Sequence, residues 1–491
     1  MKLKVKLTNL STGGQLIAII NKVNANLLNI KPLNRINIKE GIHQATAIVE
    51  IDIESKHIKK GEIGLSNELA GLLNVKNNHI LKIRKAKKPN SIFSIKDKLD
   101  GKTLTKEQIN EIIKDIVLNN LTDIEITYFI SSCLKSHLSL KETVYLIEAI
   151  VKNSGSLDLK EKIIADKHCI GGLAGNRTTM IIVPIIAAAE IIIPKTSSRS
   201  ITSPAGTADV MEVLASVSHS KKEIKGILKI TKACLVWGGA LDLAPADDKI
   251  IKIEEPISIN YEGLMIASIL AKKVVVNANR IIIDIPVGNE AKIQRYKDAK
   301  HLKKKFIKLG KKLHMKVKVI ITNGSQPIGN GIGPGLEARD VLLVLQNKGP
   351  KDLKEKSIKL AESLLKLCNK PKRLARQILE SGEAYKKMQE IIKAQGGNPN
   401  IQPENIKLSK YKKTFYSQKK GKITKVSNHL TAKYAKLAGA PSEKGSGIYL
   451  YKHLKEKVKE NEPLFDVYSE DREQIKLISK LNKKEPIYGL N

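Results

Sequence analysis

The chain has 491 residues, of which 42% are hydrophobic and only 4% aromatic, so we expect about three domains with aliphatic cores. Only ten of the 86 basic residues are arginine, so the net charge of +37 predicts a lysine-rich solvated surface that attracts anions; it disfavours nucleic-acid binding, which uses arginine and aromatic side chains. The four cysteines have neither CxxC nor metal-ligand spacing, and no apolar run suits a signal core or a transmembrane helix, so we expect a cytoplasmic protein without a bound metal or disulfide scaffold.

Residues 1–86 are predicted to form an N-terminal β-rich domain. Lys2–Leu7 and Ile51–Glu54 alternate polar and apolar residues, as half-buried strands do. The short apolar segment Ile17–Leu28 could be helical, and the basic stretch Arg84–Pro89 resembles a linker.

Residues 93–162 change to a helical period and predict a helical lobe, which we expect residues 208–235 to complete. Three capping-box sequences precede apolar residues at helical spacing. The pairs are Thr105 with Gln108, Thr122 with Glu125, and Ser139 with Glu142. The predicted role of this lobe is structural.

Residues 163–207 and 236–405 are predicted to form an α/β lobe that binds phosphate and nucleotide around a central mixed sheet. Short β-branched runs alternate there with helical segments and Gly-rich turns. The expected strands are Met180–Val183, Val274–Val276, Ile281–Ile285 and Val317–Thr322. Ligands of such sheets bind in the loops beyond the strand ends.

Residues 415–491 are predicted to form a C-terminal α+β domain. Its expected strands are Gly421–Val426, Gly447–Leu450 and Pro463–Tyr468. The intervening segments are basic and are expected to be helices or surface loops.

Two segments carry the clearest chemical signal in the chain. The first segment, Asp166–Thr179, and the second segment, Pro194–Thr207, are both rich in Gly, Ser, Thr and basic residues. Small residues let backbone N–H groups approach an anion, hydroxyls donate hydrogen bonds, and Lys or Arg adds positive charge. Neither segment contains a Walker A or GxGxxG sequence. Together they predict binding of phosphate groups.

The two segments are followed by a third motif, Gly238–Asp248, and the tail contains Leu437-Ala-Gly-Ala-Pro-Ser-Glu-Lys-Gly-Ser-Gly-Ile-Tyr449. In this combination the chain resembles the thymidine/pyrimidine nucleoside phosphorylase family over nearly its whole length. The sequence Ser198-Arg-Ser-Ile-Thr-Ser203 is similar to the nucleotide-using archaeal branch. Nucleoside-specific members carry a His- and Gly-containing loop at this place.

The resemblance implies a transferase that cleaves nucleoside 5′-monophosphates (AMP, CMP, UMP) with phosphate, giving free base and ribose 1,5-bisphosphate in nucleotide salvage and catabolism. It implies no cofactor, because phosphate is a co-substrate, and a homo-oligomer, a dimer or larger. The phosphate-binding residues it implies are Lys167, Cys169, Ser198 and Thr207. The substrate-binding residues it implies are Gly172, Ser198, Arg199, Ser200, Ile201, Thr202, Ser203, Thr207, Ser268 and Lys292.

Two positions depart from the family pattern. Cys169 stands where relatives have Ser, and a thiol is the weaker hydrogen-bond donor. Asn260 stands at the position of the Asp that is described as proton donor to the leaving base. Asn cannot deliver a proton, and loss of a general acid typically costs about 10²–10⁴-fold. Carboxylates that could substitute for it are Glu262, Asp247 and Asp248.

Two further interpretations remain open from the sequence. One is a pyrimidine nucleoside (thymidine) phosphorylase that acts on unphosphorylated nucleosides. The other is a catalytically weakened family member that binds RNA, which the basic charge and Asn260 would fit. The Gly-rich stretch Asn323–Gly335 also resembles a family loop, and we predict a turn without a catalytic role there.

Overall fold

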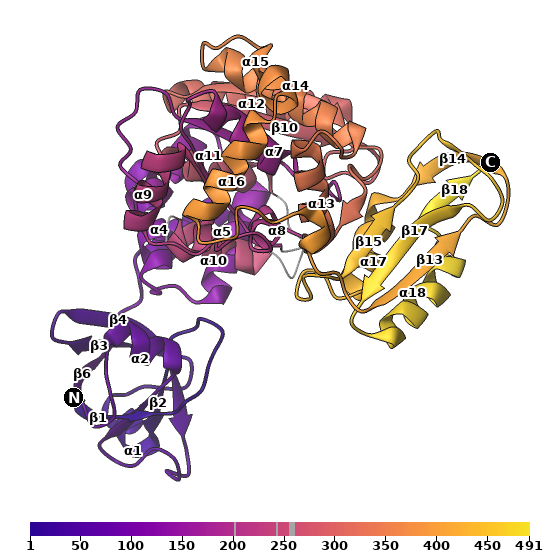
Figure 1. Ribbon diagram of the computed structural model, residues 1–491. Helices are drawn as coiled ribbons and strands as arrows, with labels where there is room; N and C mark the ends of the chain where they lie inside the picture. Colours follow the sequence, from indigo (N-terminus) through magenta and orange to yellow (C-terminus); the bar gives the residue numbers. More distant parts are fainter. Residues whose placement is uncertain (201–202, 242–243, 255–260) are drawn as a thin grey trace. The chain divides into compact units, whose positions relative to one another are not determined.

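The structure is a computed structural model that describes all residues except 201–202, 242–243 and 255–260. Its chain forms two compact units, one of residues Met1–Asn153 with Pro245–Ala267, and one of residues Ser154–Ala244 with Ser268–Asn491. Figure 1 shows the elements of both units in chain order. Ile201, Thr202 and Asn260 lie outside the described residues.

The N-terminal part of the first unit is a closed barrel with strand order β1-β5-β2-β4-β3-β6. The strands are β1 (Lys2–Leu7), β2 (Ile17–Asn21), β3 (Arg35–Glu40), β4 (His43–Asp52), β5 (Glu62–Leu65) and β6 (Ile80–Lys85). Alternate residues of β1 and β3 are buried, as the period of a half-buried strand requires. The β-rich composition predicted for this region is therefore present as a barrel.

The predicted helix over Ile17–Leu28 is half wrong. Its first part is β2, and only α1 (Lys22–Leu27) is helical. The Asn21 side chain accepts a hydrogen bond from the backbone N–H of Val23 at 2.8 Å, so this N-cap sets the change from strand to helix. A second short helix, α2 (Asn67–Leu73), precedes β6.

The helical part of the first unit contains capped helices at the three predicted places. In α4 (Lys106–Val117), α5 (Asp123–Ser136) and α6 (Leu140–Lys152) both hydrogen bonds of the capping box are present. The helix α3 (Ser91–Leu99) packs against α4 and α5. Ile109, Ile112 and Ile116 on one face of α4 are buried, which confirms the amphipathic pattern.

The segment that completes this helical part differs from the predicted one. It is Pro245–Ala267, which contains α10 (Pro245–Glu254), and not residues 208–235. The ammonium of Lys249 donates to the carbonyl oxygens of Ile116 and Val117 at 2.7 and 3.0 Å, at the C-terminal end of α4. In contrast, α9 (Lys221–Thr231) packs on β9 (Ala233–Trp237) and α16 (Glu383–Ala394) in the second unit.

The second unit is built on parallel strands. In one sheet the order is β11-β10-β7, and a parallel pair β8-β9 is joined to it by a bridge between Ile164 and Ile192. The strands are β7 (Ala165–Cys169), β8 (Ile193–Ser197), β9 (Ala233–Trp237), β10 (Arg280–Val287) and β11 (Lys316–Asn323). The pairings described here are all parallel, so the prediction of a mixed sheet was wrong for this part of the chain.

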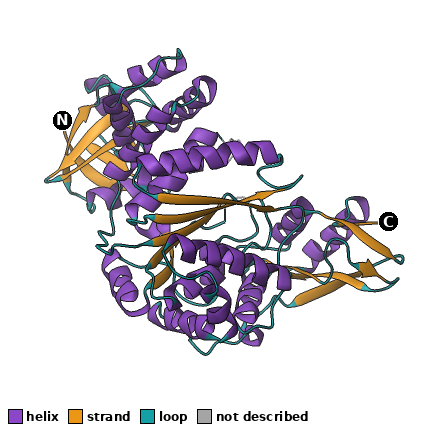
Figure 2. Ribbon diagram, turned by 90° about the horizontal axis from the view of Figure 1, so that it is seen from above, coloured by secondary structure: helices purple, strands orange, loops and turns teal. Residues whose placement is uncertain are grey.

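Helices lie on both faces of these strands (Figure 2). The helices of this part of the second unit are α7 (Thr178–Ala188), α8 (Thr207–Met211), α9, the second half of α11 (Glu262–Val275), α12 (Tyr296–Lys312), α13 (Pro334–Leu345), α14 (Lys351–Leu367), α15 (Leu374–Glu380) and α16 (Glu383–Ala394). A sheet covered on both faces buries almost all of β10, which explains its continuous apolar run.

Two of the predicted strands are helical instead. Met180–Val183 lies in α7, whose residues are buried from Thr178 to Ala187, and Val274–Val276 lies at the end of α11. A short apolar run in a fully buried helix shows no periodicity, so β-branched content alone favours a strand. Tertiary packing overrides that preference here.

The C-terminal part of the second unit contains two small antiparallel sheets, ordered β12-β15-β17-β13 and β16-β14-β18. The strands are β12 (Gly331–Ile332), β13 (Tyr411–Tyr416), β14 (Gly421–Val426), β15 (Gly447–Leu450), β16 (Lys457–Val458), β17 (Pro463–Ser469) and β18 (Tyr488–Leu490), with helices α17 (Asn428–Leu437) and α18 (Arg472–Lys484). The three strands predicted here are confirmed. Among the described residues, no helix has the length and apolar character needed to cross a membrane.

Candidate active site

The first segment begins as a strand and not as a loop. Lys167 and Cys169 belong to β7, and α7 begins at Thr178. The Lys167 side chain is buried, and its ammonium donates to the hydroxyls of Thr178 at 2.8 Å and Thr179 at 3.2 Å. Burial lowers the pKa of Lys167. A buried lysine that is held by hydroxyls can offer its charge to a single anion at this strand end.

Cys169 lies beside a carboxylate on the neighbouring strand. Its register partner on β10 is Asp284, and its sulfur accepts a hydrogen bond from Asn176 Nδ2 at 3.1 Å. Burial, and then the charge of Asp284, raises the pKa of the Cys169 thiol to about 11. The thiol is therefore protonated near neutral pH and can donate only a weak hydrogen bond, which argues against a nucleophilic role.

The carboxylate of Asp166, the first residue of the first segment, balances the positive charge of two buried lysines. Its carboxylate lies 2.7 Å from Lys273 Nζ of α11 and 3.7 Å from Lys195 Nζ of β8. Burial, and then the charge of Lys273, lowers the pKa of Lys195 to about 7. The adjacent His168 has a pKa well below its ordinary value, because it is buried among these lysines. The imidazole is therefore neutral at pH 7.

Gly172 holds the first segment against the loop that follows β10. Its φ is +80°, and a Cβ atom would lie 2.3 Å from the backbone nitrogen of Lys292. Only glycine avoids both the strained backbone and the collision. The structure thus brings together two of the predicted substrate-binding residues, Gly172 and Lys292.

The second segment is organised by Asp209 of α8. Its Oδ2 accepts the backbone N–H groups of Ser200 at 2.6 Å and Gly206 at 2.8 Å. These two amides are therefore used within the protein, and they are not free for an anion as the sequence had suggested. The hydroxyls of Ser200 and Ser203 also donate locally, to the carbonyl oxygens of Ser203 and Ala205.

Arg199 is fixed by three neighbours within the second unit. Its guanidinium pairs with Glu212 at 2.5 and 2.8 Å, approaches Asp209 at 3.4 Å, and lies 4.9 Å from the ring centroid of Trp237. Hydrogen bonding to Glu212 raises the pKa of Arg199. A guanidinium stacked on an indole and paired with a carboxylate is held in one orientation.

Arg177 connects the two segments and was not predicted. Its guanidinium donates to Thr207 Oγ1 at 3.1 Å and to the carbonyl oxygen of Ala205 at 2.9 Å, and it pairs with buried Glu337. Because Thr207 accepts this bond, its own hydroxyl hydrogen can be donated to an anion. Arg177 therefore places Thr207 beside the start of α7, where Lys167 binds Thr178 and Thr179.

The remaining predicted residues are less closely connected. Ser198 lies against Gly206 in the second segment, and half-buried Ser268 lies on α11, the helix that carries Lys273. The carboxylates considered as substitutes for Asn260 lie on α10, where Asp247 is buried, and at the start of α11, where Glu262 is half-buried. Within the described part of the chain, no cluster of three His, Cys, Asp or Glu side chains could hold a metal ion.

Signals for the missed residues do exist in the sequence. Asp166 and Asp284 are charged residues inside otherwise apolar strands, and Asp209 stands three residues after Gly206, a capping-box position. A buried carboxylate requires a cation or several N–H donors. The sequence does not indicate which lysines supply the cations.

Known protein families match this architecture. The helical bundle domain of a glycosyl transferase family matches residues 94–154, and the a/b domain of the same family matches residues 161–393. An AMP phosphorylase of Thermococcus sibiricus is 42% identical to this chain, over 99% of the chain and 97% of its own length. This chain belongs to the glycosyl transferase family that includes the AMP phosphorylases.

Other relatives define the breadth of the family. A Legionella pneumophila protein that is provisionally named as a thymidine phosphorylase is 41% identical over 89% of this chain and 84% of its own length. The anthranilate phosphoribosyltransferase of Thermus thermophilus matches in structure with a TM-score of 0.51 and 14% identity, over 61% of this chain and 98% of its own. The latter likeness supports the shared fold alone, a helical bundle combined with an α/β domain.

Proposed function

We propose that this chain catalyses the phosphorolysis of nucleoside 5′-monophosphates, such as AMP, CMP and UMP. An oxygen of inorganic phosphate attacks C1′ of the ribose 5-phosphate, and the bond from C1′ to the base breaks. The base leaves with the bonding electron pair and takes up a proton, and ribose 1,5-bisphosphate is the second product. No cofactor takes part, because phosphate is itself the second substrate.

The observation that carries this proposal is the link that Arg177 makes between the two segments. The reaction has two anions to hold, the attacking phosphate and the 5′-phosphate of the nucleotide. Lys167, Thr179 and Thr207 offer charge and hydroxyl donors from one side of this link. Arg199 and Ser198 lie earlier in the second segment than Thr207, and we assign that earlier part of the segment to the nucleotide.

Phosphate-dependent base release tests the proposal. We expect AMP, CMP and UMP to be cleaved only when inorganic phosphate is present, with adenosine and thymidine at least about tenfold slower, since the lost 5′-phosphate contacts are charge-assisted. Phosphorus NMR of the product should show two phosphate monoester signals. A preference for unphosphorylated nucleosides would overturn the proposal in favour of a nucleoside phosphorylase, the activity named for the Legionella relative.

Asn260, which lies outside the described residues, should make the reaction rate depend on which nucleobase leaves. Asparagine can donate a hydrogen bond to a departing base but cannot transfer a proton to it. Uracil can leave as a stabilised anion, whereas adenine depends more on protonation. We therefore expect Asn260→Asp to raise turnover of AMP more than turnover of UMP. Equal gains on both substrates would exclude a general-acid function at this position.

We further propose that the enzyme works as a homo-oligomer in the cytoplasm. Light scattering of the purified protein measures the number of subunits directly. A monomer at micromolar concentration would contradict this part of the proposal.

A further inference from the structure

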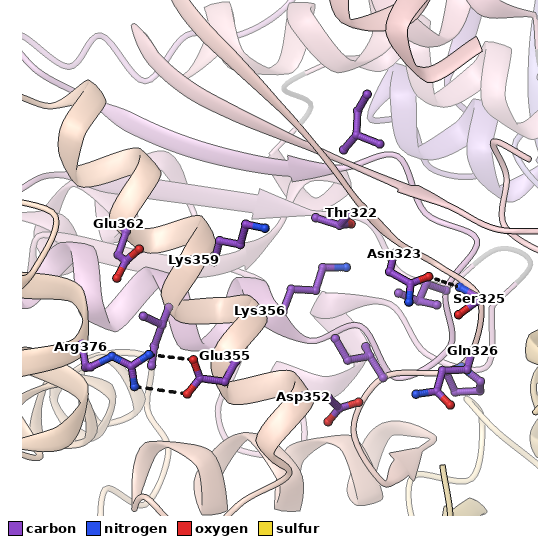
Figure 3. Close-up of a pocket in the computed structure, with 15 residues that line it drawn as sticks. Thr322, Asn323, Ser325, Gln326, Asp352, Glu355, Lys356, Lys359, Glu362 and Arg376 are labelled. Carbon is purple, nitrogen blue, oxygen red and sulfur yellow. Dashed lines mark hydrogen bonds and ion pairs between the residues drawn. The ribbon is translucent and has the colours of Figure 1, made fainter. Parts of the chain in front are cut away.

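A cavity of about 660 Å³ lies in the second unit, apart from the residues assigned to phosphate and nucleotide. Its walls are the end of β11 with the following turn, one face of α14, and Arg376 of α15 (Figure 3). The first segment touches it only through the side chain of Leu173. None of the residues that line the cavity belongs to the substrate-binding set discussed above.

Two lysines of α14 provide positive charge on one wall of this cavity, whose lining also contains Arg376 and three carboxylates. Lys356 and Lys359 are three residues apart and therefore share a face of the helix, and Figure 3 shows both ammonium groups directed toward the space in front of Thr322. Lys359 is exposed. Their arrangement places two positive charges on one wall, as a phosphate-binding site requires.

Lys356 is a buried cation with donors to spare. Only 9% of its side chain is exposed, and its Nζ lies 3.1 Å from Oδ2 of buried Asp284. Neither of these two atoms has a hydrogen bond of good geometry within the described residues. An ammonium carries three N–H donors, so Lys356 can bind a second anion from the cavity side while it stays near Asp284.

Three carboxylates of α14 line the cavity, Asp352 one helical turn before Lys356, Glu355 next to it, and Glu362 one turn after Lys359. Glu355 is already held by Arg376 at 2.7 and 3.2 Å, and Asp352 accepts the backbone N–H of Gly329 at 3.1 Å. Glu362 follows on the next turn. A simple anion would use only the lysines, whereas a polyol phosphate could also donate its hydroxyls to the carboxylates.

We propose that this cavity is a second ligand site, which binds a small phosphorylated sugar with its phosphate on Lys356 and Lys359. Sugar hydroxyls donate to Asp352 or Glu362, and the polar turn at Asn323 and Ser325 closes the phosphate end. The volume of about 660 Å³ accommodates a ligand of this size.

The site is joined to the first segment through one carboxylate. Thr322, which lines the cavity, donates from its hydroxyl to Asp284 Oδ1 at 2.6 Å, and Asp284 is the register partner of Cys169. A phosphate bound to Lys356 shares this cation with Asp284. The second site is therefore electrically coupled to the strand that carries Lys167 and Cys169.

Calorimetric titration of the full-length protein with ribose 5-phosphate, in buffer free of inorganic phosphate, tests this proposal. We expect two binding events, one at the nucleotide site proposed above and one at the cavity. The cavity event should become at least about tenfold weaker in Lys359→Gln, since a charge-assisted bond is lost. The same event should persist in Thr207→Ala. Lys366→Gln is the matched control, because Lys366 is exposed on the same helix two turns away and lies outside the cavity.

Lys356→Gln should weaken the same event, but this variant also leaves Asp284 without its ion pair, so its folding must be checked by circular dichroism. The proposal is overturned if ribose 5-phosphate binding is unchanged in Lys359→Gln, or if Thr207→Ala abolishes all of it. If inorganic phosphate binds to the Lys359-dependent site as tightly as ribose 5-phosphate, the assignment of a sugar is wrong. These measurements do not depend on the catalytic activity proposed above.

Discussion

The two segments that bind phosphate groups in our proposal are held in opposite ways. The first is stabilised by a buried lysine, Lys167, and by a glycine pressed against the backbone of Lys292. The second is stabilised by a carboxylate, Asp209, which occupies two of the backbone N–H groups. A loop proposed to bind an anion can thus have some of its backbone N–H groups bonded to a carboxylate of the protein, provided that other hydrogen-bond donors are left for the ligand.

The largest expected loss of stability comes from the first segment, where two glycine substitutions distinguish the cost of close packing from the cost of backbone strain. Gly171 and Gly172 both have positive φ, +97° and +80°, but only a Cβ at Gly172 collides with Lys292. We expect Gly171→Ala to lower the free energy of unfolding by about 1–2 kcal/mol and Gly172→Ala by about 3 kcal/mol or more, because the backbone must also shift. Equilibrium denaturation of the two variants measures the difference; equal losses would exclude a role for the close approach.

The second segment should respond most strongly to removal of its organising acid. Asp209→Ala leaves the amides of Ser200 and Gly206 without a partner, and we expect a loss of about 2–4 kcal/mol. Glu212→Gln removes only a partly exposed partner of Arg199 and should cost about 1 kcal/mol or less. Thermal unfolding and the KM for AMP should both rank the variants in this order. A larger effect of Glu212→Gln would assign the organising role to the Arg199 ion pair.

The lysines beneath the first segment predict a pH dependence of stability. The pKa of Lys195 is about 7 when folded, from an ordinary value of 10.5. Between these values the unfolded chain binds the extra proton, so the free energy of unfolding rises with pH, by up to about 1.4 kcal/mol per pH unit.

A comparison of wild type with Lys195→Met between pH 7 and 8.5 isolates this contribution. The variant keeps the ion pair between Asp166 and Lys273 and should lose the extra stabilisation with rising pH. Parallel stability curves for the two proteins would mean that Lys195 is not responsible.

The smallest effect concerns the thiol in the first segment. Cys169→Ser replaces a weak donor by a hydroxyl that can serve both Asn176 and a phosphate oxygen. We expect the KM for phosphate to fall about twofold to tenfold, within the range of one neutral hydrogen bond, with little change in kcat. Cys234→Ser, at a buried cysteine of β9, is a control that should leave the KM for phosphate unchanged. An increase in the KM for phosphate in Cys169→Ser would contradict this account.

Sequence signals predicted element boundaries to the exact residue where a side chain hydrogen-bonds to nearby backbone groups of the same helix. The capping boxes at Thr105, Thr122 and Ser139 are present in full, because such a bond needs no distant partner. The run Met180–Val183 was misjudged because α7 is buried on all sides and has no amphipathic period.

The residues of the candidate site also fall into two groups, those that the sequence could indicate and those that it could not. Gly172 and Thr207 could be selected from the sequence, since their residue types and the family pattern point to phosphate. Arg177 and the pairing of Asp284 with Lys356 could not be selected, because each depends on a partner that tertiary folding supplies. Residues of the kind proposed to bind the ligand could thus be selected from the sequence more easily than residues that hold them in place.

The helix α10 has a consequence for the order in which the molecule can be made. Lys249 caps the end of α4 from a position more than 130 residues later in the chain, and the chain passes between the two units after residues 153, 244 and 267. During synthesis, the helical part therefore receives its last segment only after residues Ser154–Ala244 of the second unit have been made. Proteolytic cleavage at one of these three crossings would leave the two units connected through the other two crossings, as long as Met1–Asn153 and Pro245–Ala267 stay packed together.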